Sequence, residues 1–428
     1  MAISIQLVII LTLFAVISLI RKEQTIWKIL LAFLILVPSS AQGLISGTSY
    51  SIAGVLNLSL VGYGTLIAGF LLMFRHRILE KKTTVAVLGC FWIILIVRVV
   101  ADGMNFISNK LFDNYLLPMF LAVIIVSYIK PQDIPSLLKL MYYLILIGAV
   151  IACVEYVNGR SLLFHQYYMD TCPWYETIYI SAQYVAFRSC SYFGHPLIGA
   201  IYYLVGVVYL LNVQSTQKKS KILFGLQFAI LTLALLSTNA RAALMGLAVY
   251  VVYYLFKKKK IGKLVALLCV VLSMMVFVDW KSLYYVLFAR DSNGSSFMVR
   301  VNAILSLINI PAKSMILGEG YNNTSSLLKS LGFIGNVEIS YLIILMENGI
   351  IGFVAWMISI FHFFNIRPKA GSYSNTIFAI HGMLAMIFIV GGMSNSFGDP
   401  GTLNYLIYIL LAFNYVIAKT SNEEKIIA

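Results

Sequence analysis

Five arginines are the residues most able to bind an anion. They are Arg160, Arg188, Arg241, Arg290 and Arg300, and they lie in the connections between long apolar segments or at their ends. A guanidinium group donates two parallel hydrogen bonds to a phosphate, so arginines that gather at one place indicate chemistry on a phosphorylated substrate. Whether these five gather depends on how the apolar segments arrange the chain.

The composition is that of a polytopic membrane protein. Of 428 residues, 61% are hydrophobic and 11% are charged, and the mean hydropathy is +0.90. Soluble domains of this length do not have such a composition. The net charge of +15 comes mostly from short basic runs between apolar segments. Such runs are typical of cytoplasmic loops, and we therefore predict no binding to nucleic acid.

The apolar segments predict an all-α protein of about 12–13 transmembrane helices, since one span needs about 20 mostly apolar residues. The first segment lacks a basic leader and a cleavage site, which favours a retained helix over a signal peptide. With no soluble domain or internal repeat, residues 1–428 are predicted to form a single transmembrane domain. The predicted spans are residues 3–20, 28–46, 52–74, 83–101, 114–129, 138–157, 195–212, 222–238, 240–256, 261–278, 338–362, 375–394 and 402–418.

The basic runs assign the connections to the two sides of the membrane. Lysine-rich connections such as residues 218–221 and 257–263, and the tail from Lys419, are predicted to be cytoplasmic. All five arginines then lie on the extracytoplasmic side, where positive charge is normally scarce. Because the lysines obey this rule and the arginines do not, we infer a specific role for the outward arginines. One helix more or less in this count would move the N-terminus to the other side of the membrane, so its side is not assigned.

Two extracytoplasmic segments, residues 158–194 and 279–337, are too long to be turns. Their aromatic and aliphatic content argues against disorder. Residues 297–310 keep apolar side chains at helical spacing up to Pro311, which predicts a helix on the membrane surface. A simple anchor and a helix that presents Arg300 to a substrate are both compatible with this pattern.

Arg241 follows a tight reversal at residues 237–240 (Ser-Thr-Asn-Ala) and begins a helix. Helix-start amides together with a guanidinium suit a phosphate group, while an arginine that reaches towards lipid headgroups is the alternative. Arg188 stands shortly before His195-Pro196. His195 is interpreted either as a base or substrate contact, or as a capping or packing residue at the start of a helix.

Two further charges, Arg98 and Glu347, fall inside predicted spans. Ionisable groups there normally face the protein interior and have partners. We predict that Glu347 is a counter-ion for an arginine, and that Arg98 is that arginine or a further substrate contact. Residues 317–321 (Leu-Gly-Glu-Gly-Tyr) contain Glu319 but lack the strand-turn-helix context of a nucleotide loop, which favours a flexible loop near a substrate.

No metal cluster is predicted, because the histidines are scattered. Cys172 and Cys190 share one extracytoplasmic loop, where a disulfide and two free thiols are both compatible with the sequence.

The order of these motifs resembles the O-antigen ligase and Wzy-type polysaccharide polymerase superfamily of bacterial envelope enzymes. The resemblance covers residues 185–360. It rests on Arg188 with Phe-Gly-His-Pro, the reversal at Arg241, Arg300 with its surface helix, residues 317–321, and Glu338 with Tyr341 leading to Glu347.

The resemblance implies an integral-membrane, GT-C-like glycosyltransferase of the bacterial plasma membrane. It transfers a glycan from an undecaprenyl-diphosphate donor on the extracytoplasmic side, and it needs no cofactor. Ligases of the superfamily have a His-Asn pair where this chain has Val337-Glu338. That departure favours a polymerase that joins repeat units of a capsule, an O-antigen or an exopolysaccharide. Transfer to another acceptor, as in ligases, is the alternative.

The resemblance also implies roles for residues. Arg188, Arg241 and Arg300 bind the diphosphate, Arg241 and Arg300 taking part in catalysis, and Glu338 orients or deprotonates the acceptor hydroxyl. The accessory residues would be His195, Arg98, Tyr341, Glu347 and Glu319. The implied partners are undecaprenyl-diphosphate-linked oligosaccharides, membrane lipid, a chain-length regulator and a flippase.

Two alternatives remain. Four aromatic residues of the first long loop either stack on sugars or pack the loop (Tyr167, Tyr168, Trp174 and Tyr175). The rival function is a flippase for lipid-linked oligosaccharides. A flippase calls for charge along a central cavity and for loops of similar length on both sides. Here the charge and the long loops gather on one side, which favours the enzyme.

Overall fold

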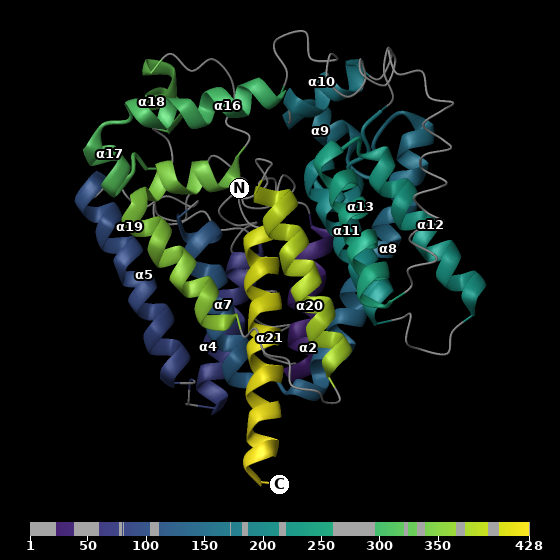
Figure 1. The fold of residues 1–428 in the computed structure, drawn as a ribbon, viewed down its shortest axis with the longest axis horizontal. Helices are drawn as coiled ribbons and strands as arrows, with labels where there is room; N and C mark the ends of the chain where they lie inside the picture. Colours follow the sequence, from purple (N-terminus) through teal and green to yellow (C-terminus); the bar gives the residue numbers. More distant parts are fainter. Residues whose placement is uncertain are drawn as a thin grey trace, which may run out of the picture.

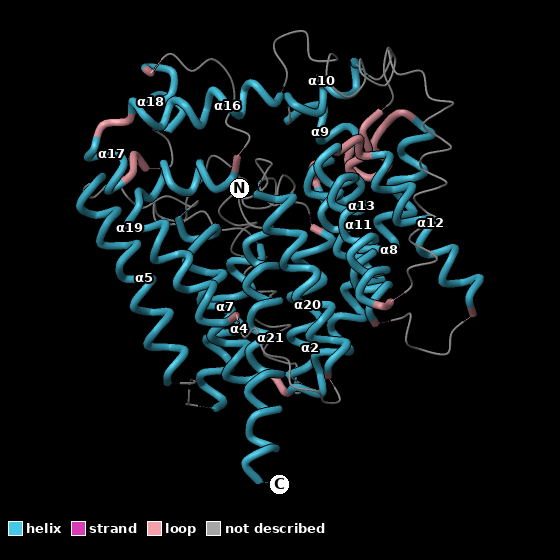
Figure 2. The backbone as a smooth tube through the Cα atoms, in the orientation of Figure 1, coloured by secondary structure: helices cyan, strands magenta, loops and turns pink. Residues whose placement is uncertain are grey.

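The computed structural model is a bundle of α-helices (Figure 1). It describes residues 23–37, 60–76, 79, 81–102, 111–171, 173–181, 187–213, 220–259, 296–320, 324–331, 339–364, 373–392 and 402–427. These residues form helices joined by loops and contain no β-strand (Figure 2). The predicted all-α class is therefore confirmed.

Long helices form the bundle, and short ones fill the connections. The bundle contains α2 (Glu23–Leu36), α4 (Leu60–His76), α5 (Lys81–Asp102), η2 (Phe112–Leu116) with α7 (Leu117–Tyr128), α8 (Ile134–Asn158), α11 (Pro196–Asn212), α12 (Lys221–Ser237), α13 (Arg241–Lys257), α19 (Ser340–Phe363), α20 (Ser374–Met386) with η8 (Ile387–Gly391), and α21 (Thr402–Ile427). The short elements are η3 (Pro131–Asp133), α9 (His165–Thr171), α10 (Pro173–Ser181), η4 (Ser191–Phe193), α16 (Ser296–Ser306), η7 (Leu307–Asn309), α17 (Ala312–Leu317) and α18 (Thr324–Ser330).

Within the described residues, four helices are long and apolar enough to cross a membrane: Pro131–Asn158, Ser340–Phe363, Ser374–Gly391 and Leu403–Thr420. Shorter apolar helices accompany them, among them Pro196–Asn212 and Lys221–Ser237. A polytopic membrane protein is thus supported by structure as well as by composition.

The helices differ in how much of their surface is covered. α11 and the apolar part of α21 are buried on nearly all sides, as expected for helices that are apolar all round. α5 instead exposes one stripe of large apolar side chains, Val85, Leu88, Trp92 and Ile96, at helical spacing. Its other face packs against α19. An exposed apolar stripe of this kind suits contact with lipid.

The short helices α9, α10, α16, α17 and α18 lie at one end of the bundle, and the C-terminus lies at the other (Figure 1). We call the first the loop end. The predicted helix at residues 297–310 is confirmed as α16 and η7, which lie across the loop end. Ile304, Leu305 and Ile308 on this helix are exposed.

Most predicted spans agree with the observed helices, and one is shifted. α2 begins at Glu23 rather than at residue 28, and it ends at Leu36. Pro38 disfavours helical conformation in the residue before it, which accounts for that end. α21 continues past its predicted end at residue 418 to Ile427. The predicted spans at residues 3–20 and 261–278 lie outside the described residues.

Candidate functional site

Arg188 and the reversal before Arg241 contact each other at the loop end. The Arg188 Nε–H donates to the carbonyl oxygen of Thr238 at 3.0 Å. The amide of Ser189 donates to the carbonyl oxygen of Ser237 at 3.1 Å, and the hydroxyls of these two serines share a hydrogen bond. Two segments that are distant in sequence therefore bring Arg188 beside the start of α13.

The reversal is shaped by polar side chains that bond to their own helix. The hydroxyls of Ser237 and Thr238 donate to carbonyl oxygens three residues earlier in α12, both at 2.7 Å. Asn239 has a φ of +53°, a conformation in which Asn is enriched among non-glycine residues. Arg241 then begins α13, and the capping position holds Ala240, which offers no side-chain acceptor. Amides at such a helix start attract anions.

His195 caps the start of α11. Its Nδ1 accepts a hydrogen bond from the Leu197 amide at 3.2 Å, which places the proton of the neutral ring on Nε2. Burial, and after it the charge of Arg188, lower the pKa of His195 to about 3. The ring is therefore neutral at neutral pH. The capping role, one of the two interpretations of the sequence, is confirmed, whereas contact with a substrate stays a prediction.

Glu155 on α8 is a residue of the site that the sequence analysis missed. Its side chain is fully buried and accepts four hydrogen bonds. Oε1 accepts from the Ser161 hydroxyl at 3.1 Å and from the Leu162 amide at 3.0 Å. Oε2 accepts from the amides of Cys190 at 3.1 Å and Ser191 at 2.7 Å. The signal that could have found it is a carboxylate inside a predicted span.

The first long loop is held by an aromatic cluster. Tyr168 and Tyr175 are fully buried and pack with Phe187 and Cys190. The Tyr175 hydroxyl accepts from the Ser161 amide at 2.8 Å. Of the two roles considered for these aromatic residues, packing is thus the role of Tyr168 and Tyr175. Tyr167 is partly buried, and the side chain of Trp174 lies outside the described residues.

Of the two cysteines in the first long loop, the structure describes Cys190. Cys190 is buried, and its thiol donates to the Arg188 carbonyl oxygen at 3.6 Å. Cys172 lies outside the described residues, so the disulfide and the two free thiols both stay open. Cys190 therefore serves as a small apolar group within the packing of the aromatic cluster.

A second polar region surrounds a break in α19. Gly349 has φ +66° and ψ 178°, a conformation essentially restricted to glycine. Just before the break, the carbonyl oxygens of Met346 and Glu347 accept hydrogen bonds from the amides of Glu319 at 2.8 Å and Gly320 at 3.1 Å. Residues 317–320, which we predicted to be flexible, are therefore fastened to the broken helix.

Arg98 and Glu347 are both buried at this break. The Arg98 Nη2–H donates to the carbonyl oxygen of Leu317, so α5 holds the end of α17. The Tyr115 hydroxyl on η2 donates to Glu347 Oε2 at 3.2 Å. Both charges face the protein interior, as expected for ionisable groups in spans. The pairing of Glu347 with an arginine stays a prediction.

Tyr341 fastens the start of α19 to the π-helical turn η8. Its hydroxyl donates to the carbonyl oxygen of Phe388 at 2.6 Å. The hydroxyl of Ser340 donates to the carbonyl oxygen of Gly391 at 3.0 Å. A Cβ atom on Gly392 would lie 2.1 Å from the Tyr341 ring, so glycine is needed for this approach. The observed role of Tyr341 is to position α19.

A protein-family model described as O-antigen ligase matches residues 226–357. Over these residues, the match supports the resemblance to the O-antigen ligase superfamily. The matched residues run from α12 to α19 and contain Arg241, Arg300, Glu338 and Glu347. The match supports a membrane enzyme of glycan transfer that acts on lipid-linked oligosaccharides. None of the curated proteins compared with the chain matches it.

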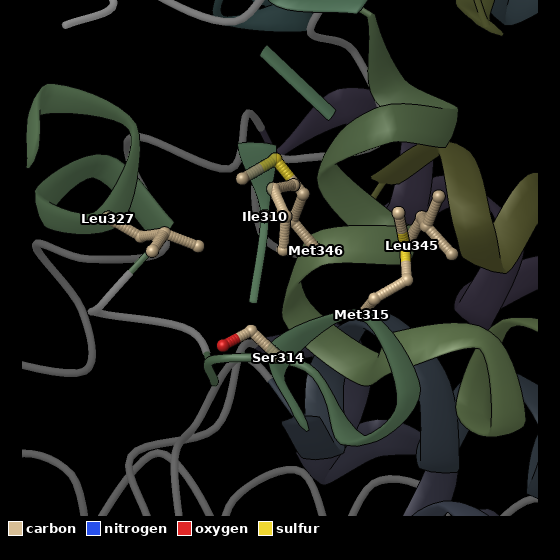
Figure 3. Close-up of a pocket in the computed structure, with 6 residues that line it drawn as sticks. All are labelled: Ile310, Ser314, Met315, Leu327, Leu345 and Met346. Atoms are coloured by element: carbon tan, nitrogen blue, oxygen red, sulfur yellow. The ribbon is translucent and has the colours of Figure 1, made fainter. Parts of the chain in front are cut away.

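Within the O-antigen ligase domain, α16 packs on α18 and α19. Ala303 of α16 joins Leu328 of α18 and Leu342 and Met346 of α19 in one buried cluster. Figure 3 shows the adjoining apolar pocket, which has no room for a water molecule and is a packing contact rather than a ligand site. Arg300 thus stands on a helix that is anchored to α19. The lining residues are Ile310, Ser314, Met315, Leu327, Leu345 and Met346.

The remaining predicted residues of the O-antigen ligase domain are only partly placed. Glu319 is partly buried beside the break in α19. Glu338 and Arg290 lie outside the described residues, which resume at Ile339. In the part of the chain that the structure describes, no three His, Cys, Asp or Glu side chains are grouped so that they could hold a metal ion.

Proposed function

We propose that this protein is a polysaccharide repeat-unit polymerase of the bacterial plasma membrane. It transfers a glycan from an undecaprenyl-diphosphate donor to a sugar hydroxyl of a second lipid-linked repeat unit. The product is a capsule, O-antigen or exopolysaccharide chain. The O-antigen ligase domain at residues 226–357 supports the class of reaction.

The observation that carries the proposal is the contact between Arg188 and the reversal before Arg241. The bond from Nε to the Thr238 carbonyl oxygen sets the direction of the Arg188 guanidinium, whose fork of N–H groups suits phosphate oxygens. Arg241 and the first amides of α13 lie at the same reversal. A leaving diphosphate gains negative charge in the transition state, and donors that are already in place stabilise it there.

The reaction is a displacement at the anomeric carbon of the donor sugar. The acceptor hydroxyl oxygen attacks this carbon while its bond to the diphosphate oxygen breaks. The electron pair leaves with undecaprenyl diphosphate, and the acceptor proton passes to Glu338 and then to water. Direct displacement inverts the anomeric configuration. Alignment of two lipid-anchored substrates in one site supplies a further part of the rate.

Contacts through η8 connect α13 with the start of α19. Gly246 on α13, about 7.5 Å along the helix from Arg241, faces Val390 of η8: a Cβ atom there would lie 2.8 Å from that side chain. The next residue of η8, Gly391, accepts a hydrogen bond from Ser340. The first half of α13 and the start of α19 therefore pack on the same turn.

The distribution of lysines supports an extracytoplasmic loop end. Lys221 begins α12 and Lys257 ends α13, so a helix length of about 25 Å separates each from the reversal at residues 237–240. Lysine-rich ends normally face the cytoplasm. A site on the opposite side meets lipid-linked repeat units after a flippase has delivered them, and a chain-length regulator would act on its product.

The experiment that tests the proposal is polymerisation by the purified protein in nanodiscs. The substrate is an authenticated cognate repeat unit on undecaprenyl diphosphate, and the product is resolved as a ladder on a gel. We expect wild type to form a ladder, and Arg188→Ala and Arg241→Ala each to lower the rate by about 100-fold or more. Lys329→Ala is the matched control, because it removes an exposed cation from α18 at the loop end, and it should leave the ladder unchanged.

The other outcomes separate the alternatives. A single transfer to a different acceptor, without a ladder, would assign the protein to ligation. Movement of the intact lipid across liposome membranes, with no glycan transfer, would refute the enzyme and establish a flippase. Loss of activity in Lys329→Ala equal to that in the arginine variants would refute a specific arginine site.

A further inference from the structure

Glu155 joins the two ends of the first long loop. It lies in the last turn of α8. Oε1 holds Ser161 and Leu162, which follow α8 directly, and Oε2 holds Cys190 and Ser191, which stand just before α11. One carboxylate therefore closes the loop at its base and accepts from three backbone amides and one hydroxyl.

These four donors explain why the position requires a carboxylate. Buried backbone amides without acceptors are costly, each by about 1–3 kcal/mol. An apolar side chain of the same size would leave all four donors without this acceptor. Because each oxygen receives two donors, a neutral amide can satisfy at most one of the two pairs.

The segment that Glu155 holds carries the residues of the candidate site. Arg188 precedes Cys190 by two residues, and His195 follows Ser191 by four. Ser191 has a φ of +50°, which a residue with a side chain adopts only when its surroundings impose it. The amide of this same residue donates the shortest of the four bonds, at 2.7 Å. Glu155 thus imposes the conformation through which the chain passes from Arg188 to His195.

The reversal before α13 holds the same segment from its other side. Ser189 and Arg188 bond to the carbonyl oxygens of Ser237 and Thr238, while Glu155 bonds to the two residues that follow. Residues 188–191 are therefore fixed between α8 and the turn that leads to Arg241. The position of Arg188 relative to Arg241 depends on both attachments.

We infer that Glu155 is a positioning residue of the diphosphate site: its carboxylate fixes residues 190–191 so that Arg188 meets the diphosphate together with Arg241. This inference rests on the proposed function. Glu155 itself touches no substrate, and it acts through Arg188. Its replacement should therefore weaken donor use by displacing Arg188, and it should do little once Arg188 has itself been impaired.

The test uses Glu155→Gln in the full-length protein in nanodiscs. Glutamine keeps the shape, but its amide nitrogen turns one pair of bonds into a contact between donors. The matched control is Glu176→Gln, which changes an exposed carboxylate on α10 of the same loop. Two readouts are needed, one of loop position and one of arginine-dependent catalysis.

The first readout is alkylation of Cys190 by a maleimide, quantified at this residue by peptide mass spectrometry. Cys190 is buried in wild type, and Glu155 holds its amide. We expect the rate of alkylation to rise at least tenfold in Glu155→Gln and to stay unchanged in Glu176→Gln. This readout needs no turnover, so it tests the anchor even if wild type forms no polymer.

The second readout is a double-mutant cycle on kcat/KM for the lipid-linked donor. We expect Glu155→Gln to lower kcat/KM at least tenfold in the wild-type background. In an Arg188→Lys background the same substitution should lower it less than threefold, because the effects of two residues that act through one another do not add. Equal factors in both backgrounds would refute action through Arg188. Unchanged alkylation of Cys190 would refute the anchor itself.

Ser161→Ala serves where Glu155→Gln does not fold. It removes one donor at 3.1 Å and leaves the carboxylate in place. It should shift both readouts in the same direction by a smaller factor, and a variant identical to wild type in both would contradict the inference. The two proposals can also fail separately. If wild type has no polymerase activity but Glu155→Gln still speeds the alkylation of Cys190, the proposed function is refuted and the anchor is not.

Discussion

Replacement of Gly349 by alanine tests whether the break in α19 is a built feature of the fold. Gly349 lies between the buried Asn348 and the second half of α19, and its backbone contacts the end of α17. A Cβ atom on residue 349 would lie 2.2 Å from the carbonyl oxygen of Ile316 and 2.5 Å from the amide nitrogen of Gly318. Both are backbone atoms, so neither can rotate away.

The cost has two sources. The conformation at φ +66° and ψ 178° costs a residue with a side chain about 1–3 kcal/mol. Relief of the clash requires residues 316–318 to move, which breaks the bonds from Glu319 and Gly320 to α19 at about 1 kcal/mol each. We therefore expect Gly349→Ala to lower the free energy of unfolding by about 3–5 kcal/mol.

The assay is unfolding in detergent by guanidinium, followed by near-ultraviolet circular dichroism. Gly225→Ala is the matched control, because Gly225 lies on an exposed face of α12 with nothing within 4 Å of a Cβ atom. There alanine should be neutral or stabilising by up to about 1 kcal/mol. If Gly349→Ala proves as stable as Gly225→Ala, the break and the attachment of residues 317–320 described above are wrong.

Three further variants probe single interactions. Tyr115→Phe removes the hydrogen bond to Glu347 and should lower the free energy of unfolding by about 1–3 kcal/mol; no change would mean that another donor replaces the hydroxyl. The pKa of His195 is lowered to about 3 from its usual 6.5, so below pH 6.5 the unfolded chain binds a proton that the folded chain does not. The free energy of unfolding should then fall by about 2 kcal/mol between pH 7 and pH 5. His195→Asn keeps a capping side chain but cannot titrate, so unfolding curves of this variant at the two pH values should lack that decrease. Ala240→Ser supplies a cap for α13 and should stabilise it by about 1 kcal/mol, while raising KM for the lipid-linked donor because the hydroxyl competes for the helix-start amides.

The helices could be predicted because apolar length is a local property. The segments predicted at residues 195–212, 222–238 and 240–256 appear as Pro196–Asn212, Lys221–Ser237 and Arg241–Lys257. The reversal between the last two was also predictable, since Ser, Thr and Asn compete for backbone bonds at helix ends. The start of α2 was not, because Glu23 and Lys28 interrupt the apolar pattern there although both belong to the helix.

The interactions that build the site were less predictable, because they join residues that are far apart in sequence. Glu155 was visible as a carboxylate in a span, but its donors at residues 161–162 and 190–191 are supplied by a loop whose path no periodicity reveals. The Gly-Glu-Gly motif at residues 318–320 was predicted to be flexible because its contacts, too, are with residues far away in sequence. Its first glycine, Gly318, approaches Gly349 so closely that a Cβ atom on Gly318 would lie 2.5 Å from the amide nitrogen of Gly349.

Both long loops are attached to the bundle by a charged side chain embedded in it. Glu155 on α8 accepts from the amides of the first loop, and Arg98 on α5 donates to the carbonyl oxygen of Leu317 in the second. The bonded backbone groups are neutral, so each attachment fixes a loop without bringing a second charge into the bundle. Hydrogen bonds to charged groups are stronger than neutral ones, and they gain strength where water is excluded.

This arrangement explains how a loop can hold arginines in a precise geometry. The chain just after Arg188 is held by Glu155 of α8, and the Arg188 side chain is held by Thr238 in the reversal between α12 and α13. A loop held only by its own contacts would have to order itself around each lipid-linked substrate, and the cost of that ordering would reduce affinity. Hydrogen bonds to charged side chains on the helices restrict the movement of the loop residues before a substrate binds. We therefore expect substitutions at Glu155 and Arg98 to change donor affinity more than substitutions of exposed loop residues.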